Sequence, residues 1–157
     1  MTTVAHALSA ALIAVTALKV PPSETRYLVA ALVAGSVADA DHVYPVLRDW
    51  RFYRQHGFRG NLHGARTPVH ELVGLLGAGV VAALLWWIDP LMAGVVFTAF
   101  AVHLAQDFVT GHSLPLNPAD RTVVHMFQLS FAHKVAVDAV VILTSVALWI
   151  PYLRARG

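Results

Sequence analysis

Histidine and aspartate residues stand within or beside apolar segments of this chain, at spacings that suit metal ligands. The sharpest pair is His103 and Asp107, four residues apart in an apolar run and followed by Thr110. Residues four apart project from one face of a helix, about 5–6 Å from each other, so an imidazole and a carboxylate there can bind one ion while Gln106 and Thr110 hold them in place. The alternative is a simple hydrogen-bonded pair, but ionisable groups within an apolar span usually mark a functional site.

A second group follows the second apolar run, in the sequence Ala38-Asp39-Ala40-Asp41-His42. Asp39 and His42 lie three residues apart and share one helical face, so both are candidate metal ligands. Asp41 can turn toward a second metal ion, accept a proton from the reacting water or cap the helix. The alternative is a polar helix end that faces water.

A third group surrounds His70, which is a further candidate ligand. The Thr67-Pro68 pair is expected to begin a helix, with threonine as the N-cap and proline at the first helical position. His70 then lies in the first turn, where free backbone N–H groups and the positive end of the helix dipole favour an anionic ligand. Glu71, next to it, is a candidate proton acceptor.

Two arginines precede this region, each four residues before a histidine. They are Arg59 before His63 and Arg66 before His70. Arginine can hold a phosphate or carboxylate through two parallel hydrogen bonds, so both are candidates for binding the substrate. His63 is a secondary candidate ligand. The alternative role for these arginines is membrane topology and contact with lipid headgroups.

The remaining polar residues of interest lie near the ends of the chain. His6 stands on an apolar helix with nothing local to pair with, so it is either a metal ligand or a core histidine bonded across helices. Asp138 and His133 are secondary candidates, and an ion pair with Lys134, one turn earlier, is the alternative role of Asp138. The other histidines are interpreted as ordinary loop residues: His56, His112 and His125.

Five apolar segments must position these residues. The expected helices run from about Val4 to Val20, from Tyr27 to Ala38 with Ser23 as the cap, from Thr67 to Ile88, from Leu91 to Val109 and from Lys134 to Leu153. Four of them approach the roughly 20 residues that cross a hydrocarbon core, and the second is shorter. Pro21 and Pro22 end the first helix, and Asp89-Pro90 makes a hairpin between the third and fourth. The sequence therefore predicts an all-α integral membrane bundle of about five helices, four or five of them transmembrane.

Composition agrees with a membrane protein. Hydrophobic residues make up 57% and charged residues 13%, well below the usual charged share of about 25%, and the mean hydropathy is +0.62. The 157 residues fit one membrane-embedded domain, with a basic loop at about residues 43–66. With no cysteine, disulfides, thiolate zinc sites and iron–sulfur clusters are excluded, so any metal must bind through nitrogen and oxygen.

Counting basic residues in the loops predicts the orientation. The basic loop lies on one side of the bilayer, which should be the cytoplasmic side of the inner membrane. On this topology the N-terminus is cytoplasmic and all nine histidines share that side. The basic pI, near 9.3, fits orientation against anionic lipid better than nucleic-acid binding.

The order of these motifs resembles the YdjM-type inner-membrane metal-dependent hydrolases. The matching elements are Ala5-His6-Ala7-Leu8, Ala38 to His42, Arg66 to His70, and His103 to Asp107 with Thr110 and the Leu114 to Pro118 tail. Ala38 stands where the family pattern has proline, and Val69 and Glu71 stand where it has threonine and serine. The resemblance implies a metal site built from the histidines and aspartates of these motifs.

The interpretation that follows is metal-assisted hydrolysis at the membrane face. One or two divalent ions, zinc by ligand type with manganese or iron as alternatives, would be held by the ligand set His6, Asp39, His42, His70, His103 and Asp107. The expected substrate is a lipid or other amphiphile with a phosphorylated or ester group, and the expected partner is the lipid bilayer. The alternatives are a metal-ion or proton transporter, a haem-binding membrane protein and a regulatory membrane protein without activity.

Overall fold

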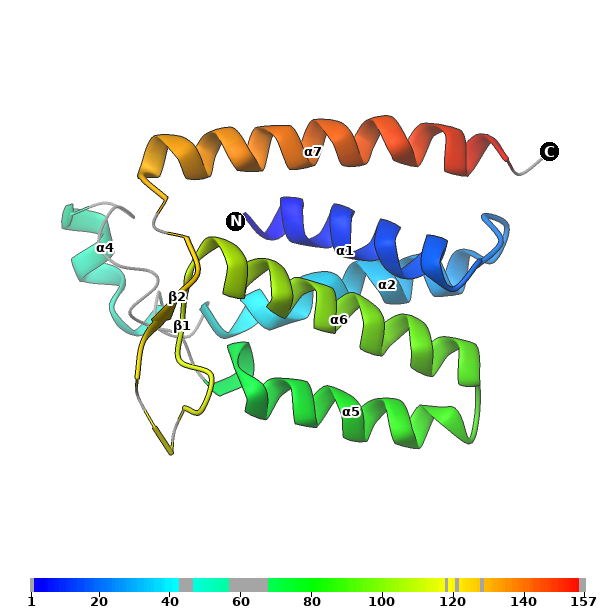
Figure 1. Ribbon diagram of the computed structural model, residues 1–157, viewed down its shortest axis with the longest axis horizontal. Coiled ribbons are helices and arrows are strands. Elements are labelled where there is room, and N and C mark those ends of the chain that lie inside the picture. Colours follow the sequence, from blue (N-terminus) through cyan, green and yellow to red (C-terminus); the bar gives the residue numbers. More distant parts are fainter. Residues whose placement is uncertain are drawn as a thin grey trace.

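The helices of this protein run back and forth along one long axis, as the computed structural model shows (Figure 1). The structure describes residues 2–42, 47–56, 68–117, 119–120, 122–127 and 129–155. In these ranges the five longer helices are α1 (Thr3–Ala17), α2 (Thr25–Val37), α5 (Leu72–Trp86), α6 (Pro90–Thr110) and α7 (Phe131–Arg154). The all-helical class is confirmed, apart from two strands of two residues each.

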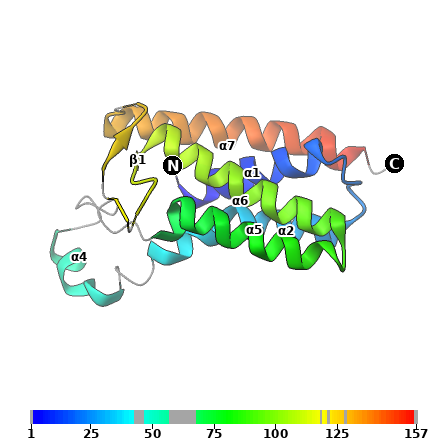
Figure 2. The same ribbon diagram turned by 60° about the horizontal axis from the view of Figure 1, so that its bottom comes forward.

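The shorter elements all lie at one end of the bundle (Figures 1 and 2). They are the 3-10 turn η1 (Ala38–His42), the helix α4 (Trp50–His56), the 3-10 turn η3 (Pro68–His70) and the antiparallel strands β1 (His112–Ser113) and β2 (Val124–His125). The sequence did not predict α4, which falls within the expected basic loop, or the small hairpin. At this end the chain therefore carries more structure than a simple connecting loop.

Helices α1, α2 and α6 pack on one another and form the core. The buried side chains there are mainly small, including Ala11, Ala14, Ala31 and Ala99, which let the helix backbones approach closely. Gly35 of α2 marks a close contact with α1, because a Cβ atom there would lie 3.2 Å from the Cβ of Ala10. This close approach brings the end of α2 against α1 and α6.

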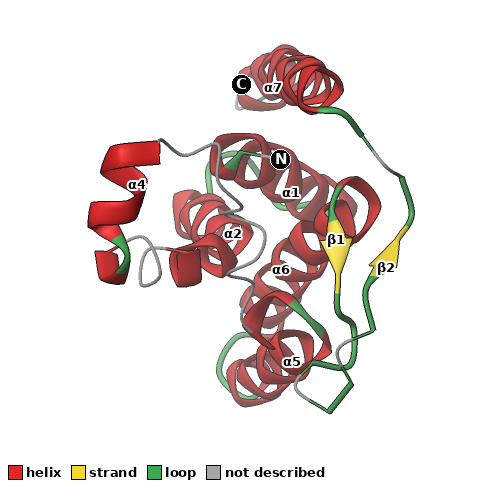
Figure 3. Cartoon of the chain, turned by 90° about the vertical axis from the view of Figure 1, so that its left-hand side faces the viewer, coloured by secondary structure: helices red, strands yellow, loops and turns green. Residues whose placement is uncertain are grey.

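The outer helices α5 and α7 flank this core. α5 packs on α6, and α7 packs mainly on α1, as the end-on view shows (Figure 3). Three hydrogen bonds hold α7 along its length. Asp138 accepts from Thr2 N–H, the Trp149 indole donates to the Leu8 carbonyl at 3.0 Å, and the Tyr152 hydroxyl donates to the Val20 carbonyl at 2.7 Å. These bonds tie an otherwise exposed helix to the core.

The helix starts follow local capping chemistry with two exceptions. Asp89 caps α6 by accepting from Met92 N–H at 3.0 Å, with proline at the first helical position. Ser23 is not the cap of α2: Glu24 holds the N-cap position and makes no side-chain cap bond. The prediction that a helix begins at Thr67-Pro68 is also wrong, because Pro68–His70 forms a 3-10 turn and α5 begins at Leu72.

Apolar side chains dominate the outside of the bundle. Every residue of α5 is at least partly exposed, and Leu76 is 63% exposed. By length and composition, α6 and Ala132–Arg154 of α7 could cross a membrane, whereas α1 and α5 are apolar but shorter. Outward-facing apolar surface of this extent is unusual for a water-soluble protein and is expected where lipid is the solvent.

Candidate metal centre

Five buried or nearly buried side chains meet at the end of the bundle that carries the short elements. They are His6 of α1, Asp39 of η1, His70 of η3, and His103 and Asp107 of α6. One ligand atom from each of Asp39, His70, His103 and Asp107 lies within 4.8 Å of all the others. Residues far apart in the sequence thus converge because α1, α2 and α6 pack closely and η3 folds back onto their end.

The separations within this cluster are those of ligands around an ion. His70 Nε2 lies 3.4 Å from Asp39 Oδ1 and 3.6 Å from Asp107 Oδ2. His103 Nε2 lies 3.6 Å from Asp39 Oδ1 and 3.8 Å from Asp107 Oδ2. These contacts are long for hydrogen bonds, whose usual length is about 2.7–3.2 Å. A tetrahedral ion with bonds of about 2.0–2.2 Å separates its ligand atoms by about 3.3–3.6 Å, close to the four distances observed.

His103 is oriented by the backbone of α2. Its Nδ1 lies 2.8 Å from the Gly35 carbonyl oxygen, which can only accept, so Nδ1 carries the proton. In the neutral ring Nε2 then has a lone pair, and it faces Asp39 and Asp107. A metal-binding histidine is usually held in this way, by an acceptor at the nitrogen away from the ion.

His6 is oriented by a hydrogen-bonded chain of fixed direction. Ser9 donates its hydroxyl proton to the Ala5 carbonyl at 2.5 Å, so its oxygen accepts from Gln106 Nε2 at 2.9 Å. Gln106 therefore presents its oxygen to His6 Nδ1, 3.0 Å away, and this nitrogen must donate. The neutral ring is left with a lone pair on Nε2, which lies 3.0 Å from Asp107 Oδ1.

His70 is held between carboxylates. Its Nδ1 donates to Asp41 Oδ2 at 2.9 Å, so that Nε2 faces Asp39 and Asp107. Burial opposes protonation of the ring, but the contacts to Asp39 and Asp41 prevail and raise the pKa of His70 to about 9. Burial likewise opposes ionisation of Asp39, yet the contact to His70 and the neighbouring imidazoles hold the pKa of its carboxyl below the usual value. Both shifts show that the carboxylates of this cluster stabilise a positive charge placed among them.

The nitrogen atoms of His6 and His103 show that a cation fits the cluster. Among the described residues, both Nε2 atoms are buried without a hydrogen-bond partner. Each faces a carboxylate, which when ionised cannot donate to it. A lone pair against an anionic oxygen is unfavourable in a dry interior. A divalent ion between nitrogen and oxygen removes this conflict, and imidazole with carboxylate is a donor set that suits zinc.

Glu71 and Asp41, the predicted proton acceptors, both accept hydrogen bonds from other residues. Glu71 accepts from the Ser113 hydroxyl at 2.6 Å and from Leu114 N–H at 2.8 Å, and it is almost completely buried. It fastens the segment after α6 to the start of α5. Asp41 accepts from His70. Both carboxylates therefore position other residues, and their role as proton acceptors stays a prediction.

The secondary candidates lie in differing surroundings. Thr110 donates to the Gln106 carbonyl at 2.8 Å, one turn earlier on α6. His133 is exposed at the start of α7 and pairs with the Ser130 hydroxyl. Asp138 accepts from Thr2 N–H at 3.0 Å, which joins α7 to the start of α1. None of the contacts described for these three residues involves the five buried residues.

Several predicted residues cannot be placed. His42 ends η1, but its side chain lies outside the described part of the structure. The substrate-binding candidates Arg59 and Arg66 and the secondary ligand His63 also lie outside the described residues. Their predicted roles are unchanged by the structure.

Sequence reasoning missed two residues that shape the site. Ser9 orients Gln106, and the Gly35 carbonyl orients His103. Ser9 follows His6 by three residues and therefore shares its helical face, which was a usable signal. No signal pointed to Gly35, because its contribution is a backbone atom that depends on how α2 meets α6.

Comparison with known proteins gives one finding. The family model described as YdjM inner membrane protein matches residues 1–155. No curated protein and no solved structure matches the chain.

Proposed function

The chain belongs to the YdjM inner membrane protein family, and we propose that it is a membrane-bound, metal-dependent hydrolase. Its catalytic centre would be the cluster of Asp39, His70, His103 and Asp107, completed by His6. The observation that carries the proposal is the set of nitrogen-to-oxygen separations, 3.4, 3.6, 3.6 and 3.8 Å, among buried donors of a metal-binding type. Zinc suits these donors, with manganese or iron as alternatives.

Some residues of the cluster would bind the ion, and others would orient the side chains that bind it. A bound divalent ion supplies Lewis-acid catalysis and activates water for attack on an ester or phosphoester. Asp39, His70, His103 and Asp107 would hold it, with His6 beside them. Asp41, Gln106 and the Gly35 carbonyl would keep the three imidazoles turned so that Nε2 faces the ion. Asp41 and Glu71 remain our candidates for taking up the proton.

A groove beside the cluster supports an amphiphilic substrate. Its volume is about 360 Å³, at the lower end of the usual range for ligand sites, about 300–1,000 Å³. The surface that lines it is mainly apolar, and the lining residues are Thr3, Val33, Ser36, Val37, Asp39 and Ala40. Because Asp39 belongs to both the groove and the cluster, a molecule with a polar head at the ion could place its chain in the groove. The basic residues Arg59 and Arg66 would bind an anionic head.

We further propose that the chain forms one membrane-embedded helical unit with four or five spans. The outward apolar surface of α5, α6 and α7 and the two helices long enough to cross a membrane support this. On the proposed topology, the basic segment around residues 43–66, the N-terminus and the cluster face the cytoplasm.

Hydrolysis of a substrate panel tests the proposal. The protein in nanodiscs would be given phosphoester and acyl-ester lipids, with and without a chelator. We expect activity that the chelator abolishes and that added zinc or manganese restores. His103→Ala should lose this activity, whereas His133→Ala, which removes an exposed imidazole outside the cluster, should keep it. Equal activity of the two variants, or activity that survives removal of all metal, would contradict the proposal.

A further inference from the structure

His6 meets the cluster differently from the other two histidines. Its Nε2 lies 3.0 Å from Oδ1 of Asp107, whereas the Nε2 atoms of His70 and His103 face the other oxygen, Oδ2, at 3.6 and 3.8 Å. The two oxygens of one carboxylate thus face two separate sets of imidazole nitrogens. A carboxylate in this position can bridge two cations.

The direction of the hydrogen bonds around His6 leaves its Nε2 as the ring atom that can bind a cation. The Ser9–Gln106 chain forces Nδ1 to donate, so Nε2 of the neutral ring presents a lone pair to Asp107. The His6 side chain is completely buried, and among the described residues its Nε2 has no hydrogen-bond partner. Water does not reach this atom, so a bound ion is the group that fits between it and the carboxylate.

The ring geometry indicates that a cation bound by His6 would lie apart from one bound by His70 and His103. Two imidazoles that bind one ion through Nε2 diverge from it, with centroids about 4.5–5.5 Å apart for bonds of about 2.0–2.1 Å. His70 and His103 approach this arrangement, at 5.7 Å and tilted by 58°. His6 and His103 are instead stacked, at 4.1 Å and 28°. Because the rings are stacked and both Nε2 atoms face Asp107, one toward Oδ1 and one toward Oδ2, their lone pairs point to two separate positions.

We propose that the site holds two divalent cations bridged by Asp107. The first lies among Asp39, His70, His103 and Oδ2 of Asp107, and the second lies between His6 Nε2 and Oδ1 of Asp107. This inference rests on the proposed function for its first ion and adds the second. The ring separation of 4.1 Å leaves room for two ions at the spacing of two-metal hydrolytic sites, about 3.5–4 Å. Such sites stabilise both the attacking and the leaving oxygen, which suits a phosphoester substrate.

Metal content and electron paramagnetic resonance test this directly. The full chain would be loaded with manganese in nanodiscs, freed of excess metal and analysed for manganese per chain. We expect two ions per chain in the wild type and a spectrum with exchange coupling between them. His6→Ala should retain one ion with the six-line spectrum of isolated manganese, and His133→Ala should match the wild type.

The outcomes distinguish this inference from the proposed function. A wild type with one uncoupled ion would overturn the second position and leave the first intact, whereas a wild type without any bound metal would contradict the proposed function as well. A folded His6→Ala variant that keeps two ions, or that loses both, would also overturn the separate second position. If His6→Ala does not fold, the wild-type spectrum decides, because a coupled signal requires two neighbouring ions.

Discussion

The three histidines of the cluster are oriented by oxygen atoms that accept hydrogen bonds at Nδ1, the ring nitrogen that faces away from the proposed ion. Gly35, Gln106 and Asp41 each offer an acceptor to the Nδ1 atom of one ring, at 2.8, 3.0 and 2.9 Å. These bonds fix both the tautomer and the rotation of each imidazole before an ion arrives. Spacing along a helix predicted the pair His103 and Asp107 and pointed to Gln106 as a residue that holds ligands in place. It could not predict which histidine each acceptor orients, because every acceptor belongs to a different element from its histidine.

The Gln106 side chain can be tested by matched substitutions. Gln106→Leu removes the acceptor for His6 and should weaken metal binding by about 10–100-fold, the usual effect of losing such a partner. Gln106→Glu keeps an acceptor and should lose less. Titration against a chromophoric chelator measures both. Wild-type affinity in Gln106→Leu would show that His6 needs no orienting bond.

The proton on His70 predicts how metal binding depends on pH. In the metal-free protein the pKa of His70 is raised to about 9, so at pH 7 an ion must displace this proton. The apparent affinity should therefore rise as pH rises toward 9, by up to about tenfold per pH unit for one proton. By the same linkage, the proton stabilises the metal-free fold fully below pH 6.5, and this contribution is lost as pH rises through about 9.

Calorimetry in two buffers of different ionisation enthalpy at pH 7 measures the protons released per ion bound. We expect about one from His70, and fewer in Asp41→Asn, where the partner that raises the pKa of His70 has lost its charge. A pH-independent affinity with no proton release would contradict this account of His70.

At the scale of elements, the start of α5 shows how tertiary contacts override a local signal. Thr67-Pro68 predicted a helix start, but the chain forms the 3-10 turn η3 instead. Leu72 N–H bonds to the Pro115 carbonyl at 3.3 Å, and Glu71 holds Ser113 and Leu114. These contacts to the segment after α6 turn η3 away from the axis of α5 and bring His70 into the cluster. Sequence alone could not predict a turn that depends on residues more than 40 positions later.

Gly74 makes this turn possible and gives a test with a built-in control. A Cβ atom at position 74 would overlap the carbonyl of Val69, whereas one at position 77 would meet nothing within 4 Å. Gly74→Ala should therefore displace η3 and lower metal affinity by at least about tenfold, as expected when a ligand is misplaced. Gly77→Ala should keep the affinity and stabilise the helix by up to about 1 kcal/mol. Equal metal affinity in the two variants, measured by the same chelator titration, would show that η3 does not depend on Gly74.

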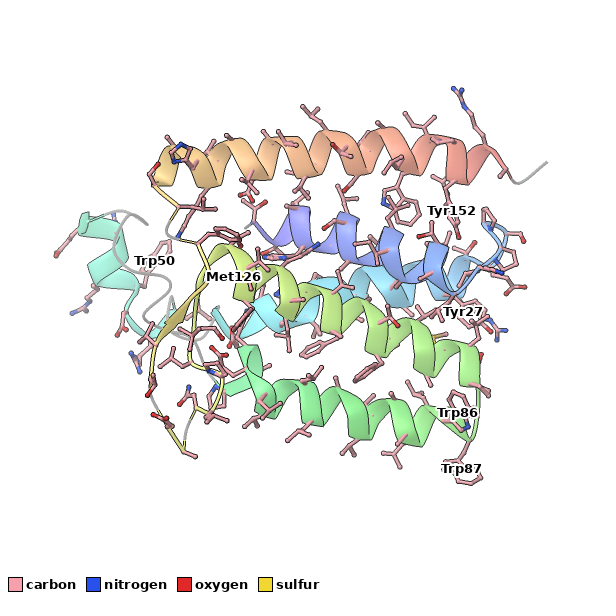
Figure 4. The ribbon with its side chains drawn as sticks, in the orientation of Figure 1. Tyr27, Trp50, Trp86, Trp87, Met126 and Tyr152 are labelled. Atoms are coloured by element: carbon pink, nitrogen blue, oxygen red, sulfur yellow. The ribbon has the colours of Figure 1, made fainter. Side chains whose placement is uncertain are left out.

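At the scale of the whole molecule, the two ends of the bundle differ in chemistry. The cluster lies at one end, and Tyr27, Trp86, Trp87 and Tyr152 lie at the other, where aromatic residues often mark a membrane interface (Figure 4). The acids described at that far end are engaged in structure: Asp89 caps α6 and accepts from Tyr27, and Glu24 pairs with Arg26. A transport path is expected to place donors toward both faces, so this distribution favours an interfacial site.

The membrane placement of α5 can be measured by spin labelling, because the chain has no cysteine. A label at Leu76, 63% exposed on α5, should be accessible to oxygen and shielded from a water-soluble nickel reagent in nanodiscs. A label at Arg51, exposed on α4, should show the reverse pattern. Nickel access at Leu76 would place α5 in water and contradict the proposed span.

The sequence predicted most of the helices, because long apolar runs are a local property, and it named all five clustered residues as candidate ligands, with an alternative role open for Asp39, His103 and Asp107. His6 was equally consistent with a ligand and a core histidine, since only the packing of α1 against α6 brings it to Asp107. The family resemblance is confirmed over residues 1–155. Tertiary packing, which no local pattern encodes, produces the acceptors at the Nδ1 atoms and the turn at η3.

Metal analysis of the purified protein beside its Asp107→Asn variant measures whether these buried residues bind a divalent metal. Asparagine preserves the shape of the side chain and removes its charge, so a folded variant isolates the contribution of the carboxylate. We predict stoichiometric metal in the wild type and in His133→Ala, and its loss from Asp107→Asn. A wild type without stoichiometric metal after purification and reloading, or an Asp107→Asn variant that binds as much metal as the wild type, would contradict the account.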